Sequence, residues 1–127
     1  MVTALVGQSK YDMSMITRSG GMWYLKESKK PFTGIGYVLS GQSGEKIIES
    51  KYLKGQLHGQ HNEWWENGKK KRQGRYKTGK RHGRWVEFHE NGNIFTENSY
   101  RNGIHNGLSA EWHKNGAMHY RGEYENG

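Results

Sequence analysis

The sequence predicts an all-β fold, in which tandem β-hairpins build an elongated antiparallel sheet or open β-solenoid. Three observations support this fold class. A set of residues recurs every 24 positions. Asn-Gly pairs, which are a strong local hairpin signal, stand at the same place in each copy. Glycine occurs 19 times and proline once, at Pro31, which is typical of many tight turns rather than long helices.

The composition indicates a single folded domain with a thin core. The chain has 127 residues, a formal net charge of +8 and only 31% hydrophobic residues. Low hydrophobicity with high net charge is also typical of disordered chains. However, the chain contains 5 Trp, 8 Tyr and 3 Phe, far more aromatic residues than a solvated tail needs. We therefore expect a folded chain whose aromatic residues are spread thinly.

The repeat is clearest in the second half of the chain. Each copy begins with a tyrosine, followed by glycines 3 and 7 residues later, a glutamate at 11, an aromatic residue at 12 and Asn-Gly at 15 and 16. The tyrosines are Tyr52, Tyr76, Tyr100 and Tyr124. The predicted units are therefore 52–75, 76–99 and 100–123, with the start of a further unit at 124–127.

The region before residue 52 follows the repeat less closely. Residues 24–51 form a degenerate copy, because 28 residues instead of 24 separate Tyr24 from Tyr52. Residues 1–23 carry no repeat, although 18–21 read as a turn before a strand at 22–26. We expect segment 1–23 to be a lead-in strand or a cap, since a stacked array needs its exposed end covered.

Each unit reads as one hairpin. In the first complete unit, the strands are predicted at about 60–66 and 69–77. Asn67-Gly68 joins them, and we expect a type I′ turn there, with positive φ at both central residues. The Tyr-x-x-Gly-x-x-x-Gly segment then turns the chain into the next hairpin.

The alternation of side chains along a strand assigns the two faces. The aromatic column is predicted to be the spine of the packed face, and the glutamate column lies on the other face. The aromatic column consists of Trp64, Phe88 and Trp112. The glutamate column consists of Glu63, Glu87 and Glu111, which we expect to pair with neighbouring cations or to cap the repeat turn.

The repeat pattern resembles the MORN-repeat variant family of bacteria, which includes YwqK-type proteins regarded as antitoxins. The matching stretches are 52–59 with 64–68, 76–83 with 90–92, and 100–103 with 114–116; 30–34 resembles the opening of a first repeat. The resemblance covers 24–127. It implies a non-enzymatic module whose sheet face binds another macromolecule, and for the YwqK-like group a toxin that the protein blocks. A basic chain would suit an acidic partner.

Two sets of residues are candidates for binding. The first is a protein-binding set of tryptophans on the repeated sheet face, since Trp is frequent in binding hot spots. It consists of Trp64, Trp65, Trp85 and Trp112. The second is a run of nine cations with no Asp or Glu among them. It consists of Lys69, Lys70, Lys71, Arg72, Arg75, Lys77, Lys80, Arg81 and Arg84.

The basic hairpin 69–84 has two readings. It is either an anion-binding patch, for an acidic protein surface, nucleic-acid phosphate or anionic lipid, or a solvated hairpin whose lysines keep an open sheet from pairing. Tyr76, His82 and Trp85 lie among the cations and would allow base stacking. Tyr76 nevertheless belongs to the repeated tyrosine column, so its primary role is predicted to be structural.

The sequence contains no pattern of catalysis, metal binding or cofactor binding. It has no cysteine, Gly-x-Ser-x-Gly motif or phosphate loop, and Asp12 is the only aspartate. Equivalent histidines in successive hairpins would lie ~10 Å apart, too far to share a metal ion. His58 and His82 fit a turn role. Glu87 and His89 lie on one strand face and are the remaining candidates for binding a metal or relaying a proton, a role that we do not expect of them. We expect a non-enzymatic protein without metal or cofactor.

Compartment and assembly follow from simple features. No stretch approaches the ~20 apolar residues of a membrane span, and the first residues lack the basic flank of a signal peptide. We therefore expect a cytoplasmic protein. An unpaired sheet edge at the end of the array would allow a homodimer to form by strand addition.

Overall fold

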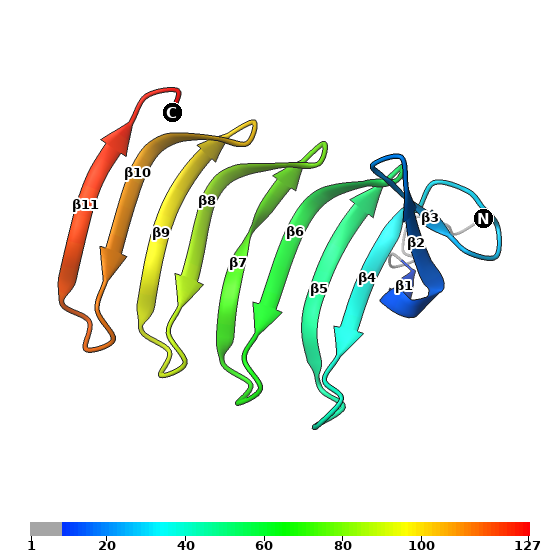
Figure 1. Cartoon of the computed structure of the whole chain (residues 1–127), viewed down its shortest axis with the longest axis horizontal. Helices are drawn as coiled ribbons and strands as arrows, with labels where there is room; N and C mark the ends of the chain where they lie inside the picture. Colours follow the sequence, from blue (N-terminus) through cyan, green and yellow to red (C-terminus); the bar gives the residue numbers. More distant parts are fainter. Residues whose placement is uncertain (1–8) are drawn as a thin grey trace, which may run out of the picture.

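The computed structural model describes residues 9–127, and nearly all of them belong to strands or tight turns (Figure 1). Residues 1–8 of the predicted lead-in lie outside the described residues. The N-terminal elements are β1 (Lys10–Asp12), a 3-10 turn η1 (Met13–Met15), β2 (Ile16–Ser19) and β3 (Met22–Leu25). The remaining strands are β4 (Gly34–Leu39), β5 (Lys46–Leu53), β6 (Gln56–Trp64), β7 (Lys70–Lys77), β8 (Lys80–Phe88), β9 (Ile94–Arg101), β10 (Ile104–Trp112) and β11 (Met118–Tyr124).

The strands form one open row, which confirms the predicted elongated antiparallel sheet. The order is β1-β4-β5-β6-β7-β8-β9-β10-β11, so from β4 onward each strand pairs with its neighbour in the sequence (Figure 1). All of these pairs are antiparallel except β1 with β4, which is parallel. β2 and β3 form a separate two-stranded hairpin.

The predicted type I′ turns at Asn-Gly were wrong. Gly68 has a φ of 85°, but Asn67 has no positive φ, and the Gly68 amide donates to the Trp65 carbonyl at 2.9 Å. The loop is therefore a turn followed by a left-handed glycine, with a register shift at Glu63/Trp64. The two-residue turns with positive φ at both positions stand at the other end of the sheet. In the nine-stranded sheet they are Lys54-Gly55, Thr78-Gly79 and Asn102-Gly103, and Gly20-Gly21 forms another between β2 and β3.

The first strand of each hairpin also begins earlier than predicted. β6 begins at Gln56, so the second glycine of the repeat lies inside a strand. Gly59 has a φ of 106°, and the ladder between β5 and β6 shifts register between Ser50 and Tyr52. This glycine therefore allows a bulge, because its backbone conformation is strained for residues with a side chain.

The asparagines of the Asn-Gly loops link neighbouring repeats. The Asn67 side-chain amide donates to the Glu90 carbonyl at 2.9 Å, and that of Asn91 donates to the Lys114 carbonyl at 2.8 Å. At the opposite end, the Gly79 amide donates to the Leu57 carbonyl at 2.8 Å. Backbone and side-chain hydrogen bonds thus join each hairpin to the next at both ends of the strands.

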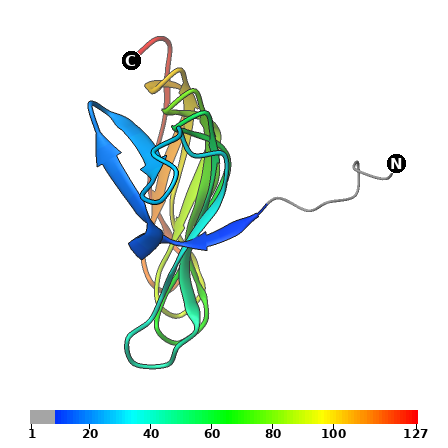
Figure 2. The same cartoon turned by 90° about the vertical axis from the view of Figure 1, so that its right-hand side faces the viewer.

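Among residues 9–127, a cluster of buried hydrophobic side chains forms only at the N-terminal end. Ile16, Phe32 and Tyr52 are buried together, and the centroids of the Phe32 and Tyr52 rings lie 5.1 Å apart. The β2–β3 hairpin covers this cluster and lies on one face of the sheet (Figure 2), where Trp23 packs edge-on against Tyr52. Beyond β5, the sheet is a single layer.

We name the two faces by their side chains. The tyrosine face carries the repeated column Tyr52, Tyr76, Tyr100 and Tyr124. The basic face is the opposite one and carries Lys51, Arg75, Lys77, Lys80 and Arg84, which alternate with tyrosine-face residues along the strands.

The predicted packed spine was wrong. Trp64, Phe88 and Trp112 lie on the basic face and are only half-buried. The most buried aromatic residue beyond β5 is Trp85, which is 2% exposed and lies on the tyrosine face. A single layer has no second sheet to cover either face. Burial therefore depends on side chains that lie along the sheet over neighbouring residues.

Candidate functional site

Arg72 and Arg81 are the two cations of the basic hairpin that lie on the tyrosine face, and both contact other side chains. The Arg72 guanidinium lies between two carboxylates, 3.2 Å from Glu63 and 3.4 Å from Glu87. Arg81 lies over the Trp85 ring at 4.7 Å and donates to the Tyr100 hydroxyl at 3.2 Å. The pairing of Glu63 and Glu87 with a neighbouring cation confirms the role expected for these two glutamates.

A buried polar chain on the same face had no signal in the sequence. The Ser50 hydroxyl lies 2.6 Å from Nδ1 of His61, and Nε2 of His61 lies 2.8 Å from Glu63. The hydrogen bond with His61, reinforced by Arg72, lowers the pKa of Glu63, although burial opposes this shift. Ser50 and His61 are 11 residues apart, so only the register of β5 on β6 brings them together.

The basic face holds the cations that remain exposed. Lys51, Arg75, Lys77 and Lys80 have no ion pair with another described residue. Arg84 is exposed but pairs with Glu97 at 2.6 Å, and this contact raises the pKa of Arg84.

The other cations of the basic hairpin lie at or near the loop end of the sheet. The Lys71 ammonium is 4.7 Å from the centre of the Trp65 ring, and the Lys69 ammonium donates to the Asn91 carbonyl at 3.2 Å. The Lys70 ammonium donates to the Gln73 side chain at 2.6 Å. The nine predicted cations therefore do not form one patch, but divide between two faces and a loop.

The four predicted tryptophans also do not share one surface. Trp85 is buried on the tyrosine face, where its indole nitrogen donates to the Arg75 carbonyl at 3.0 Å. Trp64 and Trp112 lie on the basic face and are half-buried. Trp65 lies in a hairpin loop, and its indole nitrogen donates to the Phe88 carbonyl at 3.2 Å.

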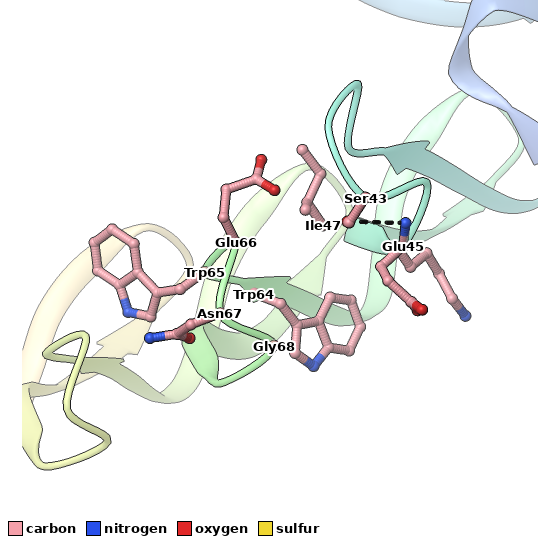
Figure 3. Close-up of a pocket in the computed structure, with 9 residues that line it drawn as sticks. Ser43, Glu45, Ile47, Trp64, Trp65, Glu66, Asn67 and Gly68 are labelled. Carbon is pink, nitrogen blue, oxygen red and sulfur yellow. Dashed lines mark hydrogen bonds between the residues drawn. The ribbon is translucent and has the colours of Figure 1, made fainter.

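A groove separates the first two hairpin loops. It has a volume of about 470 Å³, and its walls include Glu45, Ile47, Trp64 and Trp65. Figure 3 shows the Trp64 and Trp65 rings directed to opposite sides of their loop, with Trp64 on the side of Glu45. A similar groove of about 380 Å³ lies between the next two loops, with Trp65 and Phe95 among its walls.

Within residues 9–127, no group of three or more His, Cys, Asp or Glu side chains lies close enough to hold a metal ion. His89 is instead bound within the array, since its Nε2 lies 2.9 Å from the Trp112 carbonyl. His58 and His82 have the turn role expected of them. Their Nδ1 atoms accept hydrogen bonds from Thr78 and Asn102, the first residues of the next two-residue turns. The same residues contain no helix long and apolar enough to cross a membrane.

Comparison with known families supports the repeat. Residues 57–78 and 81–102 each match the model of the MORN repeat variant. The two matches are adjacent and cover β6 to β9, the part of the sheet that carries the exposed Arg75, Lys77 and Lys80. Searches of curated proteins and of solved structures find no match to this chain. A repeat of the MORN type suggests a repeat-based binding module.

Proposed function

We propose that this chain is a non-enzymatic protein-binding module, and that its basic face docks on an acidic surface of a partner protein. The MORN-type repeats of β6 to β9 support a binding role. The exposed cations of the basic face indicate that the partner's surface is negatively charged. Exposed cations attract an acidic surface and accelerate the encounter, because complementary fields steer association.

One observation carries this proposal: the cations of the basic hairpin are bonded to other side chains on one face of the sheet, whereas three of them are exposed and unpaired within the described residues on the other. Arg72 and Arg81 are half-buried and bonded on the tyrosine face. Arg75, Lys77 and Lys80 are exposed on the other face and have no carboxylate partner among residues 9–127. Uncompensated like charges on adjacent strands repel one another. Because Arg75, Lys77 and Lys80 do not stabilise the fold through ion pairs with other described residues, a binding role accounts for their presence better than a stabilising one.

The half-buried ring of Trp64 lies on the same face as these cations. Aromatic residues beside cations are frequent at interface cores, because a ring supplies apolar contact at low entropic cost. Trp64 therefore belongs to the proposed interface. Trp85 does not, because it is buried on the opposite face.

In the specific form of the proposal, the partner is a toxin and the chain neutralises it by direct binding. Support for this form comes from the resemblance of the repeat to YwqK-type proteins. An open sheet suits such a role, since it offers one broad surface that can occlude a partner.

The test is capture of the partner from the native host with the full-length chain as bait. The charge-reversal variant R75E/K77E/K80E is compared with K26E/K29E/K30E, which changes the net charge equally on exposed residues of the segment that follows β3. We expect the first variant to lose the partner and the second to retain it. The purified partner should then form a 1:1 complex with the wild-type chain in light scattering.

Other partners would give different results. Binding to RNA, DNA or anionic vesicles that falls steeply with salt, without a protein partner, would contradict the proposal. For the toxin form, co-expression of the partner should arrest growth, and the wild-type chain but not R75E/K77E/K80E should restore it. Growth that is unaffected by the partner alone would reject the toxin form and leave protein binding intact.

A further inference from the structure

The basic face contains a notch lined by hydrogen-bond donors. It has a volume of about 260 Å³ and lies over β6, β7 and β8, near the two-residue turns. Its walls are His58, Gly59, Arg75, Tyr76, Lys77 and His82. No carboxylate lines this notch, and neither Arg75 nor Lys77 has an ion pair with another of residues 9–127.

The hydrogen bonds of the two histidines determine their tautomers. The Thr78 amide donates to Nδ1 of His58 at 3.0 Å, and the Asn102 amide donates to Nδ1 of His82 at 3.4 Å. An Nδ1 atom that accepts carries no proton, so the proton of each neutral imidazole is on Nε2. Each ring therefore offers an N–H donor that has no protein partner among the described residues.

The register places these donors beside the two cations. His82 is directly opposite Arg75 in the ladder between β7 and β8. His58 is bonded to Thr78, the residue after Lys77, and therefore stands beside Lys77. The result is a group of four side chains that only donate, with two formal positive charges.

We infer that this notch binds a phosphate monoester group. Two positive charges match a phosphate dianion, and the planar guanidinium of Arg75 suits bidentate contact with phosphate oxygens. The imidazole donors supply hydrogen bonds to further oxygens. The inference rests on the proposed function for the source of the group, which we take to be a phosphorylated side chain of the protein partner.

The chain itself contains the matched control for this site. In the third repeat, Asn106 stands where His58 and His82 stand in the earlier ones, and its side-chain oxygen accepts from the Asn126 amide at 3.1 Å. Asparagine therefore preserves the bond to the next turn but removes the Nε2 donor. Ser99 likewise stands where Arg75 stands in the preceding unit.

The test is a titration of the full-length chain with inorganic phosphate and with a phosphoserine peptide, followed by amide NMR shifts. We expect saturable shifts confined to residues around the notch. Arg75→Ser and the double variant H58N/H82N should each weaken binding by about tenfold or more, because each removes donors to a charged group. Lys70→Ser removes an exposed cation outside the notch and should change affinity less than about twofold.

Several results would overturn the inference. These are shifts spread evenly over the basic face, equal weakening by Lys70→Ser, an unphosphorylated peptide that binds as well as the phosphopeptide, or binding only to phosphatidic acid vesicles. Failure of the inference is distinguishable from failure of the proposed function. Partner capture that depends on Arg75, Lys77 and Lys80 but survives H58N/H82N would retain the function and reject the phosphate site.

Discussion

Trp85 lies flat over Gly74 of the neighbouring strand, and a methyl group on Gly74 would overlap with the indole ring. The Trp85 side chain fills the space that the glycine leaves, with its indole nitrogen bonded to the Arg75 carbonyl at 3.0 Å. In the next unit the equivalent pair is Asn98 and Ser109, joined by a hydrogen bond of 2.6 Å. At this cross-strand position, one unit therefore pairs a glycine with a tryptophan, and the next unit pairs two polar residues that share a hydrogen bond.

This pairing predicts a strong coupling between residues 74 and 85. Gly74→Ala should destabilise the fold by about 1–3 kcal/mol, because it overpacks a closed contact. The double variant G74N/W85S, which copies the pair of the next unit, should be less destabilised than the sum of its single changes. Urea unfolding of the four proteins measures this, and strict additivity would show that the two residues do not pack as described.

The hydrogen bond between Asn67 and the next repeat predicts that replacing Asn67 lowers stability more than replacing the equivalent Asn115. Asn67→Ala removes the bond to the Glu90 carbonyl and the one from the Lys69 amide, whereas Asn115→Ala removes the local bond to the Ala117 amide. We expect Asn67→Ala to cost about 1 kcal/mol more than Asn115→Ala. Thermal and urea unfolding provide the comparison, and equal losses would mean that the inter-repeat bond contributes nothing.

Thr78 predicts a stabilising substitution. It has a φ of 50°, which is strained for a β-branched residue, and Asn102 holds the same φ of 50° one unit later. Thr78→Asn should raise the free energy of unfolding by about 1 kcal/mol, since asparagine tolerates the left-handed region. The bond from the residue 78 amide to His58 is retained. A decrease in the urea midpoint would contradict the assigned backbone conformation.

Tyr52 predicts a loss of stability at alkaline pH. Burial raises the pKa of Tyr52 from the ordinary value of 10.0 to about 12. Above pH 10 the unfolded chain releases this proton while the folded chain retains it, so the free energy of unfolding falls between pH 10 and 12. The loss should be on the order of 2 kcal/mol.

Tyr52→Phe isolates this contribution. The variant keeps the ring in the cluster with Phe32 but cannot ionise, so its stability should decline less over the same pH range. Tyr124→Phe is the control, because Tyr124 is exposed at the end of the array. Parallel pH profiles for wild type and Tyr52→Phe would contradict the assigned shift.

The glutamate column illustrates what could be predicted about the candidate site. The repeat indicated that Glu63 and Glu87 share a face and would meet a cation, and Arg72 lies between them. The basic hairpin 69–84 already grouped Arg75, Lys77 and His82, but the approach of His58 from the preceding unit was not predicted, because it depends on the bond between its ring and the Thr78 amide.

The sequence by itself determined that the chain is an open array of antiparallel hairpins. A 24-residue period with recurring glycines specifies where each strand reverses, and hydrogen bonding between neighbours then extends the row. Only the tertiary structure decided which side chains of each face are buried and which cations stay exposed. In a single layer both faces meet water, so alternation shows which residues share a face but not how they pack. That outcome depends on neighbours such as Gly74 and Trp85, and on the N-terminal hairpin that covers one end of the tyrosine face.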